Sequence, residues 1–390
     1  MLGDASEEPL TMAGRRRGGH WLTAAAPRIA AGAAIAVLTA ACGTPVSPGR
    51  TADVVTAVLP ATGVTITEAG SGLLFPLART WAVAYRRQVP GVTVTTASIG
   101  SKAGIAAAVD GKADIGASDA YLSSGDLVQK PTMLNIPLAI SAQTVIYNLP
   151  GRSATSHVQL NGSVLARIYE GSITRWTDPA ITALNKNLSL PDLKIVPIHR
   201  SDGSGDTFLF TSYLSTQDAT WDASIGYGTT ANWPTVPGAK SANGSVATMK
   251  YCQATPGCVA YNGISYLSQA LANGLGEAAL ENSASQYTLP TAAAINATAG
   301  SFVSLTPSNE TISMIDGPSL GGIGYPIINY EYAIVNSRQP NAAMARAVRA
   351  FLTWAITTGN EATYLNSVGF QALPAPVLQL GADQIKEIGT

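Results

Sequence analysis

The sequence predicts an α/β protein of two lobes built on a parallel, doubly wound sheet. Two observations predict it. Short strand and helix patterns alternate from residue 63 onward, and two long strand candidates far apart in the chain enclose a segment with strands and helices of its own. Such alternation is typical of parallel sheets. The length of 390 residues agrees with two lobes and a short leader.

The first elements follow one another as strand, turn and helix. Residues 64–67 have a strand pattern, 69–72 form a Gly-rich turn, and 73–85 have the apolar spacing of a helix. A strand, a turn, a helix and a further strand are then expected at 92–97, 100–102, 103–109 and 113–117. In such sheets ligands bind at the carboxyl ends of strands, where helix N-termini present free N–H groups to anions. The turns are therefore the places to look for a site.

The two long strand candidates, 140–148 and 325–336, are expected to cross between the lobes. The segment between them has a helix near 164–169, a strand at 193–197, a helix beginning near Asp206 and a strand at 259–261. A helix at 342–357 is expected to close the regular part of the chain. We therefore expect a discontinuous first lobe and an inserted second lobe, with boundaries at 63–145 plus 325–390 and at 146–324.

Composition limits the class of partner. Hydrophobic residues make up 46% of the chain, charged residues only 12%, and the formal net charge is -1. These values argue against a nucleic-acid surface, a polybasic membrane patch and a disordered polyelectrolyte. The ligand is expected to be small.

The N-terminus has the pattern of an export signal. Arg15, Arg16 and Arg17 precede an uncharged, Ala-rich run at 29–41 that ends at Cys42. The run has the length of a signal-peptide core, about 7–15 residues, and falls short of the roughly 20 residues of a transmembrane helix. We expect residues 1–41 to be a signal peptide.

The four residues Thr39-Ala40-Ala41-Cys42 resemble the lipobox of bacterial lipoproteins. This resemblance implies a lipidated Cys42, a flexible tether at 42–62 rich in Pro, Ser and Thr, and an exported protein anchored on the outer face of the cytoplasmic membrane. The alternative is a cysteine buried at the end of a helix.

The other two cysteines, Cys252 and Cys258, enclose the turn-forming residues Gln-Ala-Thr-Pro-Gly. In an exported protein this spacing is consistent with a disulfide across a hairpin. A metal or redox pair is the alternative, but the spacing is not C-x-x-C and no His lies nearby.

Three turns carry residues suited to an anion. The first contains Ser71, Gly72 and Leu73, where a hydroxyl and backbone N–H groups begin a helix, although a Ser in this place is also an ordinary helix cap. The second contains Ser101 and is followed, after the next strand, by Asp119, which could equally be a cap or a solvated turn residue.

The third turn, after the strand at 193–197, contains Arg200, Asp202, Ser204, Gly205 and Asp206. Arg offers planar bidentate donors for phosphate, and Ser204 and the residues after it can turn successive N–H groups toward one point. Asp202 is placed to hold Arg200 in position. The run lacks the Gly-Lys-Ser/Thr ending of a Walker A loop.

Together these turns resemble the periplasmic phosphate-binding proteins of ABC importers, PstS type. The resemblance rests on Ala69-Gly70-Ser71, Gly100-Ser101, Gly116-Ala117-Ser118-Asp119-Ala120 and Arg200-Ser201-Asp202-Gly203-Ser204-Gly205, and it extends from about Val64 to the C-terminus. The Cys252–Cys258 loop and the residues Ser313-Met314-Ile315-Asp316-Gly317-Pro318 resemble its actinobacterial lipoprotein branch.

The resemblance implies the type II periplasmic-binding-protein fold, with a dehydrated phosphate in the cleft between two lobes joined by crossing strands. It implies permease subunits with their cytoplasmic ATPase as partners, and no cofactor, metal or catalytic residue. The implied phosphate-binding residues are Ser71, Gly72, Leu73, Ser101, Asp119, Arg200, Ser204, Gly205 and Asp206, with Asp202 behind Arg200.

Two positions depart from the family pattern. Gly72 stands where many members carry Thr, so a side-chain donor is lost, and Asp206 stands where some members have Thr. Because an inward carboxylate would repel the ligand, we expect the backbone N–H of Asp206, and not its side chain, to face the anion.

Asp119 is expected to exclude sulfate. Phosphate at neutral pH still carries a proton that it can donate to a carboxylate, whereas sulfate carries none. Two unit charges about 4 Å apart at an effective dielectric near 20 repel by roughly 4 kcal/mol, which corresponds to a discrimination on the order of a thousandfold.

Three other classes of function fit the sequence less well. A phosphatase would need a base beside a hydroxyl, and neither His20, His157 nor His199 is placed as one by the sequence. A sulfate or molybdate receptor would have no use for a buried acceptor such as Asp119. A structural or adhesive lipoprotein would not need the three turns to converge.

Overall fold

A computed structural model describes residues 63–151, 156–318 and 320–390. These residues belong to one compact unit. The predicted signal peptide, Cys42 and the tether lie outside the described residues. No helix in the described ranges has the length and apolar character needed to cross a membrane.

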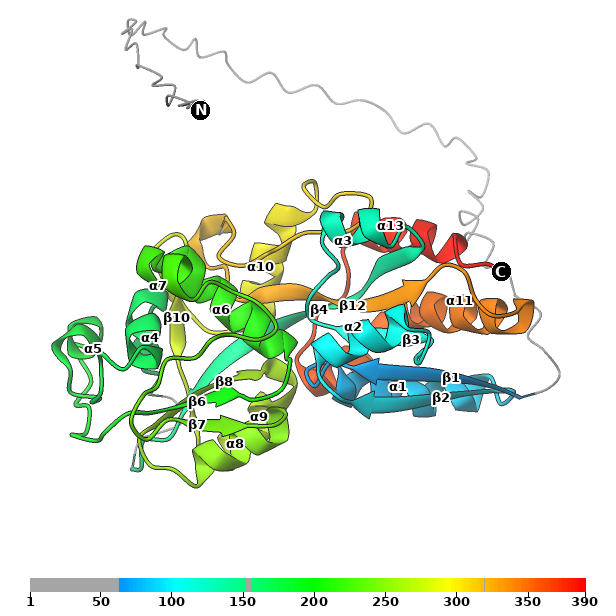
Figure 1. Cartoon of the computed structure of the whole chain (residues 1–390). Coiled ribbons are helices and arrows are strands. Elements are labelled where there is room, and N and C mark those ends of the chain that lie inside the picture. Colours follow the sequence, from blue (N-terminus) through cyan, green and yellow to red (C-terminus); the bar gives the residue numbers. More distant parts are fainter. Residues whose placement is uncertain (1–62, 152–155, 319) are drawn as a thin grey trace, which may run out of the picture. The chain divides into compact units, whose positions relative to one another are not determined.

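The strands alternate with helices along most of the chain (Figure 1). The strands are β1 (Val64–Gly70), β2 (Val92–Ser98), β3 (Ile115–Ser118), β4 (Met133–Tyr147), β5 (Gln159–Leu160), β6 (Val196–Arg200), β7 (Lys240–Ala242), β8 (Cys258–Gly263), β9 (Gly276–Glu277), β10 (Ala279–Glu281), β11 (Tyr287–Thr288) and β12 (Ile328–Asn336). The α-helices are α1 (Phe75–Gln88), α2 (Ser101–Val109), α3 (Ser124–Gln129), α4 (Gly162–Tyr169), α5 (Pro179–Leu184), α6 (Gly205–Gln217), α7 (Ala219–Ser224), α8 (Ser245–Gln253), α9 (Leu267–Ala272), α10 (Ala292–Phe302), α11 (Ala342–Ile356), α12 (Ala362–Leu365) and α13 (Ala375–Lys386). The short 3-10 helices are η1 (Ile264–Tyr266), η2 (Leu320–Gly322), η3 (Thr358–Asn360) and η4 (Asn366–Val368).

Within the described ranges the main sheet has the order β2-β1-β3-β12-β4-β8-β6-β7, and β9 also pairs with β4. The strands β1, β2 and β3 are parallel, and so are β6, β7 and β8. Because β12 is antiparallel to β3 and β4, the sheet is mixed and not parallel throughout as the sequence predicted. A separate three-stranded sheet has the order β11-β10-β5.

The two long strands lie side by side at the centre of the unit, as Figure 1 shows. The first part of β4 pairs with β12 over residues 133–142, and its last part pairs with β8 and β9 over residues 143–147. Every residue of β4 is buried. One strand thus joins the two groups of parallel strands, and the lobe boundaries at 145/146 and 324/325 remain predictions.

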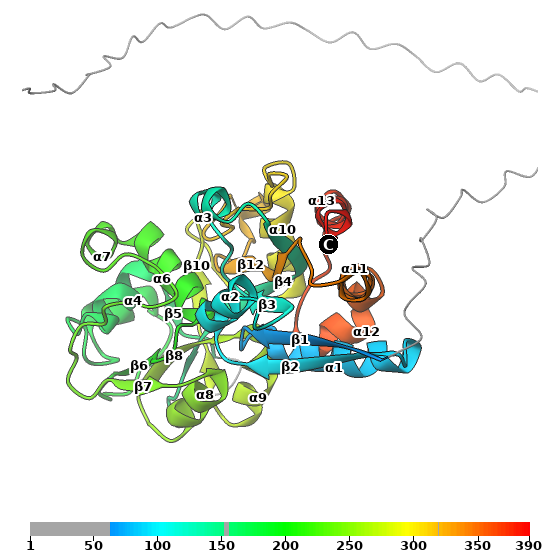
Figure 2. The same cartoon turned by 45° about the vertical axis from the view of Figure 1, so that its right-hand side comes forward.

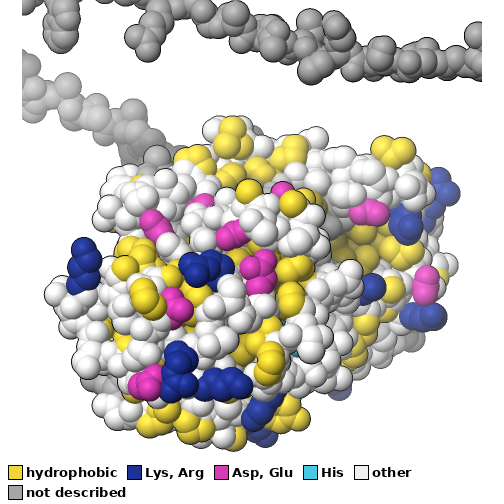
Figure 3. All heavy atoms as spheres, turned by 60° about the vertical axis from the view of Figure 1, so that its left-hand side comes forward, with side chains coloured by type: hydrophobic (Ala, Val, Ile, Leu, Met, Phe, Trp, Pro, Cys, Tyr) yellow, Lys and Arg dark blue, Asp and Glu magenta, His cyan; other side chains and the backbone are white. Residues whose placement is uncertain are grey.

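Helices pack against the strands and form the core with them. Helix α1, which has a Pro in its first turn, packs against β2, while α11 packs against β1 and β4 and against α1 (Figure 2). Helix α2 packs against β1 and β3. Figure 3 shows one face of the molecule, on which Lys and Arg side chains are interspersed with Asp and Glu.

Several predicted boundaries need correction. Strand β4 begins at Met133 and not at 140, β6 begins at Val196 and not at 193, and β12 begins at Ile328 and not at 325. The prediction that 342–357 closes the regular part of the chain is wrong, because α12 and α13 follow it. The predicted pairing of Cys252 with Cys258 is confirmed, since a disulfide links the end of α8 to the start of β8.

Candidate anion-binding site

The predicted turns converge at the ends of β1, β3 and β6. Ser71 follows β1, Ser101 begins α2, Asp119 follows β3, and Arg200 ends β6. The side chains of this group are at most 4% exposed, and so are those of Ser204 and Asp206 at the start of α6. The residues are therefore withdrawn from bulk water, where each hydrogen bond to an anion has a larger effect.

Backbone N–H groups without an acceptor surround the same point. In the described ranges this holds for the N–H groups of Gly72, Leu73, Ser101, Gly205 and Asp206. The first N–H groups of a helix have no partner within that helix, and the starts of α2 and α6 leave theirs free in this way. These donors and the partial positive charge of the helix N-termini suit an anion.

The hydroxyl of Ser71 is engaged on both sides. Its Oγ accepts the N–H of Leu74 at 2.9 Å and donates to Oδ1 of Asp119. Ser101 acts in a different way, because its Oγ accepts the N–H of Asp119 at 3.2 Å and keeps its own proton available for a ligand.

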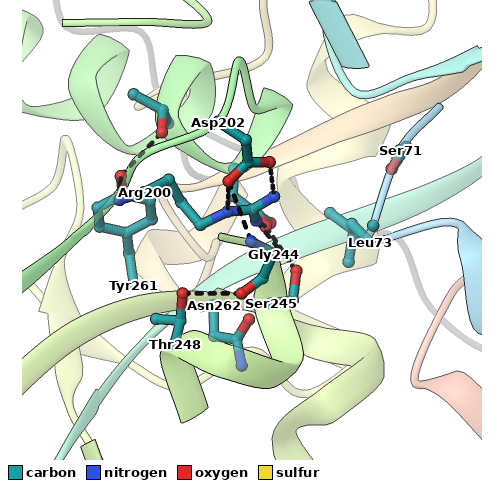
Figure 4. A network of polar contacts seen from close by, with 12 residues as sticks. Ser71, Leu73, Arg200, Asp202, Gly244, Ser245, Thr248, Tyr261 and Asn262 are labelled. Carbon is teal, nitrogen blue, oxygen red and sulfur yellow. Dashed lines mark hydrogen bonds and ion pairs between the residues drawn. The ribbon is translucent and has the colours of Figure 1, made fainter. Parts of the chain in front are cut away.

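Arg200 is held by two carboxylates, of which Figure 4 shows that of Asp202. Its Nε donates to Oδ1 of Asp202 at 2.7 Å and its Nη2 pairs with Oδ2 of the same residue, so Asp202 holds the guanidinium through two contacts. Its Nη1 pairs with Oδ2 of Asp206 and donates to Ser245 Oγ at 3.1 Å. Burial alone would lower the pKa of Arg200, but these two carboxylates raise it, so the guanidinium stays charged.

The side chain of Asp206 lies against Arg200 at the start of α6, and whether its N–H alone faces the anion remains a prediction. The side chain pairs with Arg200, accepts the hydroxyl of Ser245 at 2.9 Å, and is 1% exposed. Its second oxygen, Oδ1, has no partner in the described part of the chain. Burial raises the pKa of Asp206, although the charge of Arg200 opposes this shift.

Asp119 is surrounded by two other carboxyl groups, those of Asp206 and Glu331, and by donors that include Ser71. Burial and the charge of Asp206 raise its pKa to about 6, whereas the polar side chains of Glu331 and Ser71 beside it and the charge of Arg200 lower it. Gly205 packs directly against this side chain.

The turns also touch one another. The N–H of Lys102 donates to the carbonyl of Gly203 at 3.1 Å, and the hydroxyl of Tyr266 donates to the carbonyl of Gly72 at 3.0 Å. A Cβ added at Gly72 would lie 3.0 Å from Ser245 Oγ. The absence of a side chain at residue 72 is therefore matched by a hydroxyl from α8.

Sequence reasoning missed Ser245 and Glu331. Ser245 follows β7 and begins α8, so the strand, turn and helix pattern of the other turns would have found it. Glu331 is the one charged residue of β12 and is fully buried. The signal for it was an acidic residue inside the strand that was expected to cross between the lobes.

His199 does not approach the hydroxyls of the site. Its ring stacks on Trp233 with the ring centres 4.8 Å apart, and its Nδ1 lies 3.1 Å from the carbonyl of Arg200. Burial lowers the pKa of His199. The described residues contain no group of three or more His, Cys, Asp or Glu side chains that could hold a metal ion.

Comparison with known proteins gives a consistent result. Residues 55–358 match the family model of the PBP superfamily domain. The chain is 33% identical over 315 residues to the phosphate-binding protein PstS of Pasteurella multocida, which covers 81% of this chain and 88% of that protein. It is 31% identical over 304 residues to the phosphate-binding protein PstS 3 of Mycobacterium leprae, with 75% and 78% covered.

Solved structures agree on the fold. A phosphate-binding protein from Stenotrophomonas maltophilia superposes with a TM-score of 0.62 at 19% identity, covering 82% of this chain and 93% of that one. A putative phosphate ABC transporter substrate-binding protein from Clostridium perfringens, solved with bound phosphate, gives a TM-score of 0.55 at 18% identity, covering 80% and 100%. These superpositions support the two-lobed fold.

Proposed function

Because this chain belongs to the PstS family of phosphate-binding proteins, we propose that it captures inorganic phosphate outside the cytoplasm and delivers it to the permease of an ABC transporter. The family is one of substrate-binding transport proteins and not of enzymes. The observation that carries the proposal is the convergence of Asp119, Arg200 and unpaired N–H groups at one buried point.

The donors of the proposed site come from three turns. Ser101 and Ser204 offer hydroxyls, and Arg200 offers a guanidinium that Asp202 and Asp206 hold in place. The free N–H groups of Gly72, Leu73, Ser101, Gly205 and Asp206 complete the set. Ser71 contributes by holding Asp119, and Ser245, unforeseen from the sequence, contributes by donating its hydroxyl to Asp206 and accepting from Arg200.

Selectivity is proposed to come from acceptors. A carboxylate at Asp119 can receive the proton that phosphate carries and sulfate lacks. The unpaired Oδ1 of Asp206 is a second acceptor in the same site, so we propose that it faces the ligand with its side chain as well as its N–H. Two acceptors require two protons, which a singly charged phosphate brings with it.

We further propose that the chain is exported, anchored through a lipid on Cys42, and docked on permease subunits that work with a cytoplasmic ATPase. The apolar run before Cys42 supports the anchor, and the family supports the partner. We also propose that the protein performs no catalysis, because His199 is stacked on Trp233 and does not contact a hydroxyl of the site.

Isothermal titration of the ligand-free protein with phosphate and with sulfate tests the proposal. Phosphate is expected to bind tightly and sulfate to give no heat. Absence of phosphate binding would contradict the receptor function. Equal binding of both anions would leave a general oxyanion receptor and remove the role of Asp119 in selectivity.

A further inference from the structure

Glu331 lies beside Asp119 in the proposed phosphate site, and the proposed function gives it no role. It belongs to β12, its side chain is fully buried, and its Oε2 lies 3.5 Å from Ser71 Oγ. The same hydroxyl donates to Asp119. Two carboxyl groups therefore approach one hydroxyl, which has a single proton.

The proton of Ser71 is not available to Glu331. Ser71 Oγ accepts the N–H of Leu74 at 2.9 Å and gives its proton to Asp119. Glu331 must obtain its hydrogen bonds elsewhere, because a buried carboxylate without donors is strongly disfavoured.

On its other side Glu331 meets Ser141 of β4. Ser141 Oγ lies 2.5 Å from Oε1 of Glu331 and 2.7 Å from Oδ1 of Asn329. The orientation of the Asn329 amide is fixed, because its Nδ2 donates to the carbonyls of Asp119 at 2.9 Å and of Tyr330 at 2.5 Å. Its Oδ1 can thus only accept.

Counting protons then decides the state of Glu331. Ser141 has one proton and two acceptors if Glu331 is ionised, which leaves one close oxygen pair without a hydrogen. If Oε1 of Glu331 carries a proton, Glu331 donates to Ser141, Ser141 donates to Asn329, and Asn329 donates to the backbone of Asp119. Every group in this series of hydrogen bonds then has a partner.

The surrounding charges agree with this assignment. The titratable groups that face Glu331 are Asp119 after β3, Asp206 at the start of α6, and Tyr332 on β12 itself. The nearby cation, Arg200, is paired with Asp202 and Asp206, and no ion pair among the described residues includes Glu331. Burial first, and then the charge of Asp119, raise the pKa of Glu331 well above its usual range.

We propose that Glu331 is held as a neutral carboxylic acid that positions Asp119 through Ser141 and Asn329. Asp119 then remains the oriented proton acceptor, and no second charge beside it repels the anion. Glu331 is a positioning residue for phosphate selectivity, an inference that rests on the proposed phosphate binding.

The pH dependence of phosphate binding in Glu331→Gln tests the charge of Glu331. The amide keeps a donor and an acceptor, so we expect a modest loss of affinity, about threefold, with the same ratio to the parent protein at each pH from about 5 to 8. A variant that binds phosphate more than about tenfold more tightly at pH 8, with a difference that vanishes at pH 5, would overturn the proposal, because only an ionised Glu331 repels the anion.

The positioning role is tested with Glu331→Leu, which removes the donor. We expect it to lose at least about tenfold more phosphate affinity than Glu331→Gln, together with selectivity over sulfate. Glu310→Gln, which changes another buried glutamate that bonds to Gln384, is the matched control and should retain both properties. Equal losses in the Gln and Leu variants would contradict positioning through a donated hydrogen bond.

Infrared spectroscopy measures directly whether the carboxyl group of Glu331 is protonated. A protonated carboxylic acid has a carbonyl stretching band that a carboxylate lacks. In difference spectra against the parent protein, in which the bands of other neutral carboxyls such as Glu68 cancel, the band of Glu331 should be lost in Glu331→Gln and shifted in Ser141→Ala. Spectra without such a change would refute the neutral state, even if the Leu variant fails to fold. If the parent protein binds no phosphate at any pH, the proposed function fails, while the infrared result still decides the protonation of Glu331.

Discussion

Gly205 and Asp119 approach so closely that a Cβ on residue 205 would clash with Oδ2 of Asp119. The start of α6 therefore packs against the turn after β3 without room for a methyl group. Gly205 is required here for this close approach, because any side chain at this position would meet Asp119.

Gly205→Ala is expected to weaken phosphate binding by roughly 2 kcal/mol, or about thirtyfold, because Asp119 or α6 must shift. Titration calorimetry measures the loss. Gly125→Ala is the matched control, because residue 125 is also helical and an added Cβ there would come no closer than 3.7 Å to another group. Unchanged affinity in the Gly205→Ala variant would show that the contact opens when phosphate binds.

Asp119→Asn should change selectivity more than it changes stability. Removing the charge lifts the repulsion of sulfate, so we expect measurable sulfate binding and a phosphate-over-sulfate preference reduced by about tenfold to about a thousandfold. Competition titrations with both anions check this. Asp222→Asn, at an exposed position in α7, should leave the preference unchanged. An unchanged phosphate-over-sulfate preference in Asp119→Asn would show that other groups determine the selectivity.

Asp206 is expected to make phosphate binding weaker at alkaline pH. With Asp119 and Asp206 both accepting, the complex needs one proton more than the doubly charged phosphate supplies. The singly charged phosphate carries this proton at low pH and loses it as the pH rises through neutrality. The affinity should then fall by about tenfold per pH unit above neutrality.

Asp206→Thr removes the second acceptor and should flatten this profile. The hydroxyl of Thr donates to the anion, so the variant should surpass the parent protein near pH 8 and not near pH 5. Titrations across this pH range in parallel decide the matter. Profiles with equal slopes would show that the Oδ1 of Asp206 receives no proton from the ligand.

The sequence predicted the parts of the site that depend on local patterns. Ser71, Asp119 and Arg200 follow strands and precede helices, and parallel strands bring their carboxyl ends to one edge. The roles of the Asp206 side chain and of Glu331 could not be predicted in this way. They depend on how β12 packs beside β4 and on how closely α6 approaches the turn after β3, neither of which local spacing determines.

The start of β4 was missed for a different reason. Pro137 lies inside the strand, and a Pro normally argues against a central strand because it lacks a donor. Here the register shifts between Glu331 and Tyr332, whose partners are Ala139 and Pro137, so Leu138 is an extra residue in β4. This bulge accommodates the Pro, and a bulge leaves no simple trace in a sequence.

Glu68, a buried residue outside the proposed site, is expected to make the stability of the protein depend on pH. Its side chain is 6% exposed, its Oε2 has no partner in the described part of the chain, and it lies beside Trp81, Ala78 and Phe351. Burial raises its pKa to about 8 from 4.5. The unfolded chain therefore ionises first, so the stability that the neutral folded form retains at low pH is lost as the pH rises from about 4.5 to 8.

Glu68→Leu should remove this loss. The free energy of unfolding of the variant, relative to the parent protein, is expected to increase between pH 5 and pH 8 by up to about 4 kcal/mol, since each pKa unit corresponds to about 1.4 kcal/mol. Chemical denaturation at the two pH values measures the difference. Glu387→Leu, at an exposed position, should show no such increase, because solvent hydrates that carboxylate in both states. A difference for Glu68→Leu that does not change with pH would show that Glu68 is ionised in the folded protein, with solvent or a neighbouring donor reaching its Oε2.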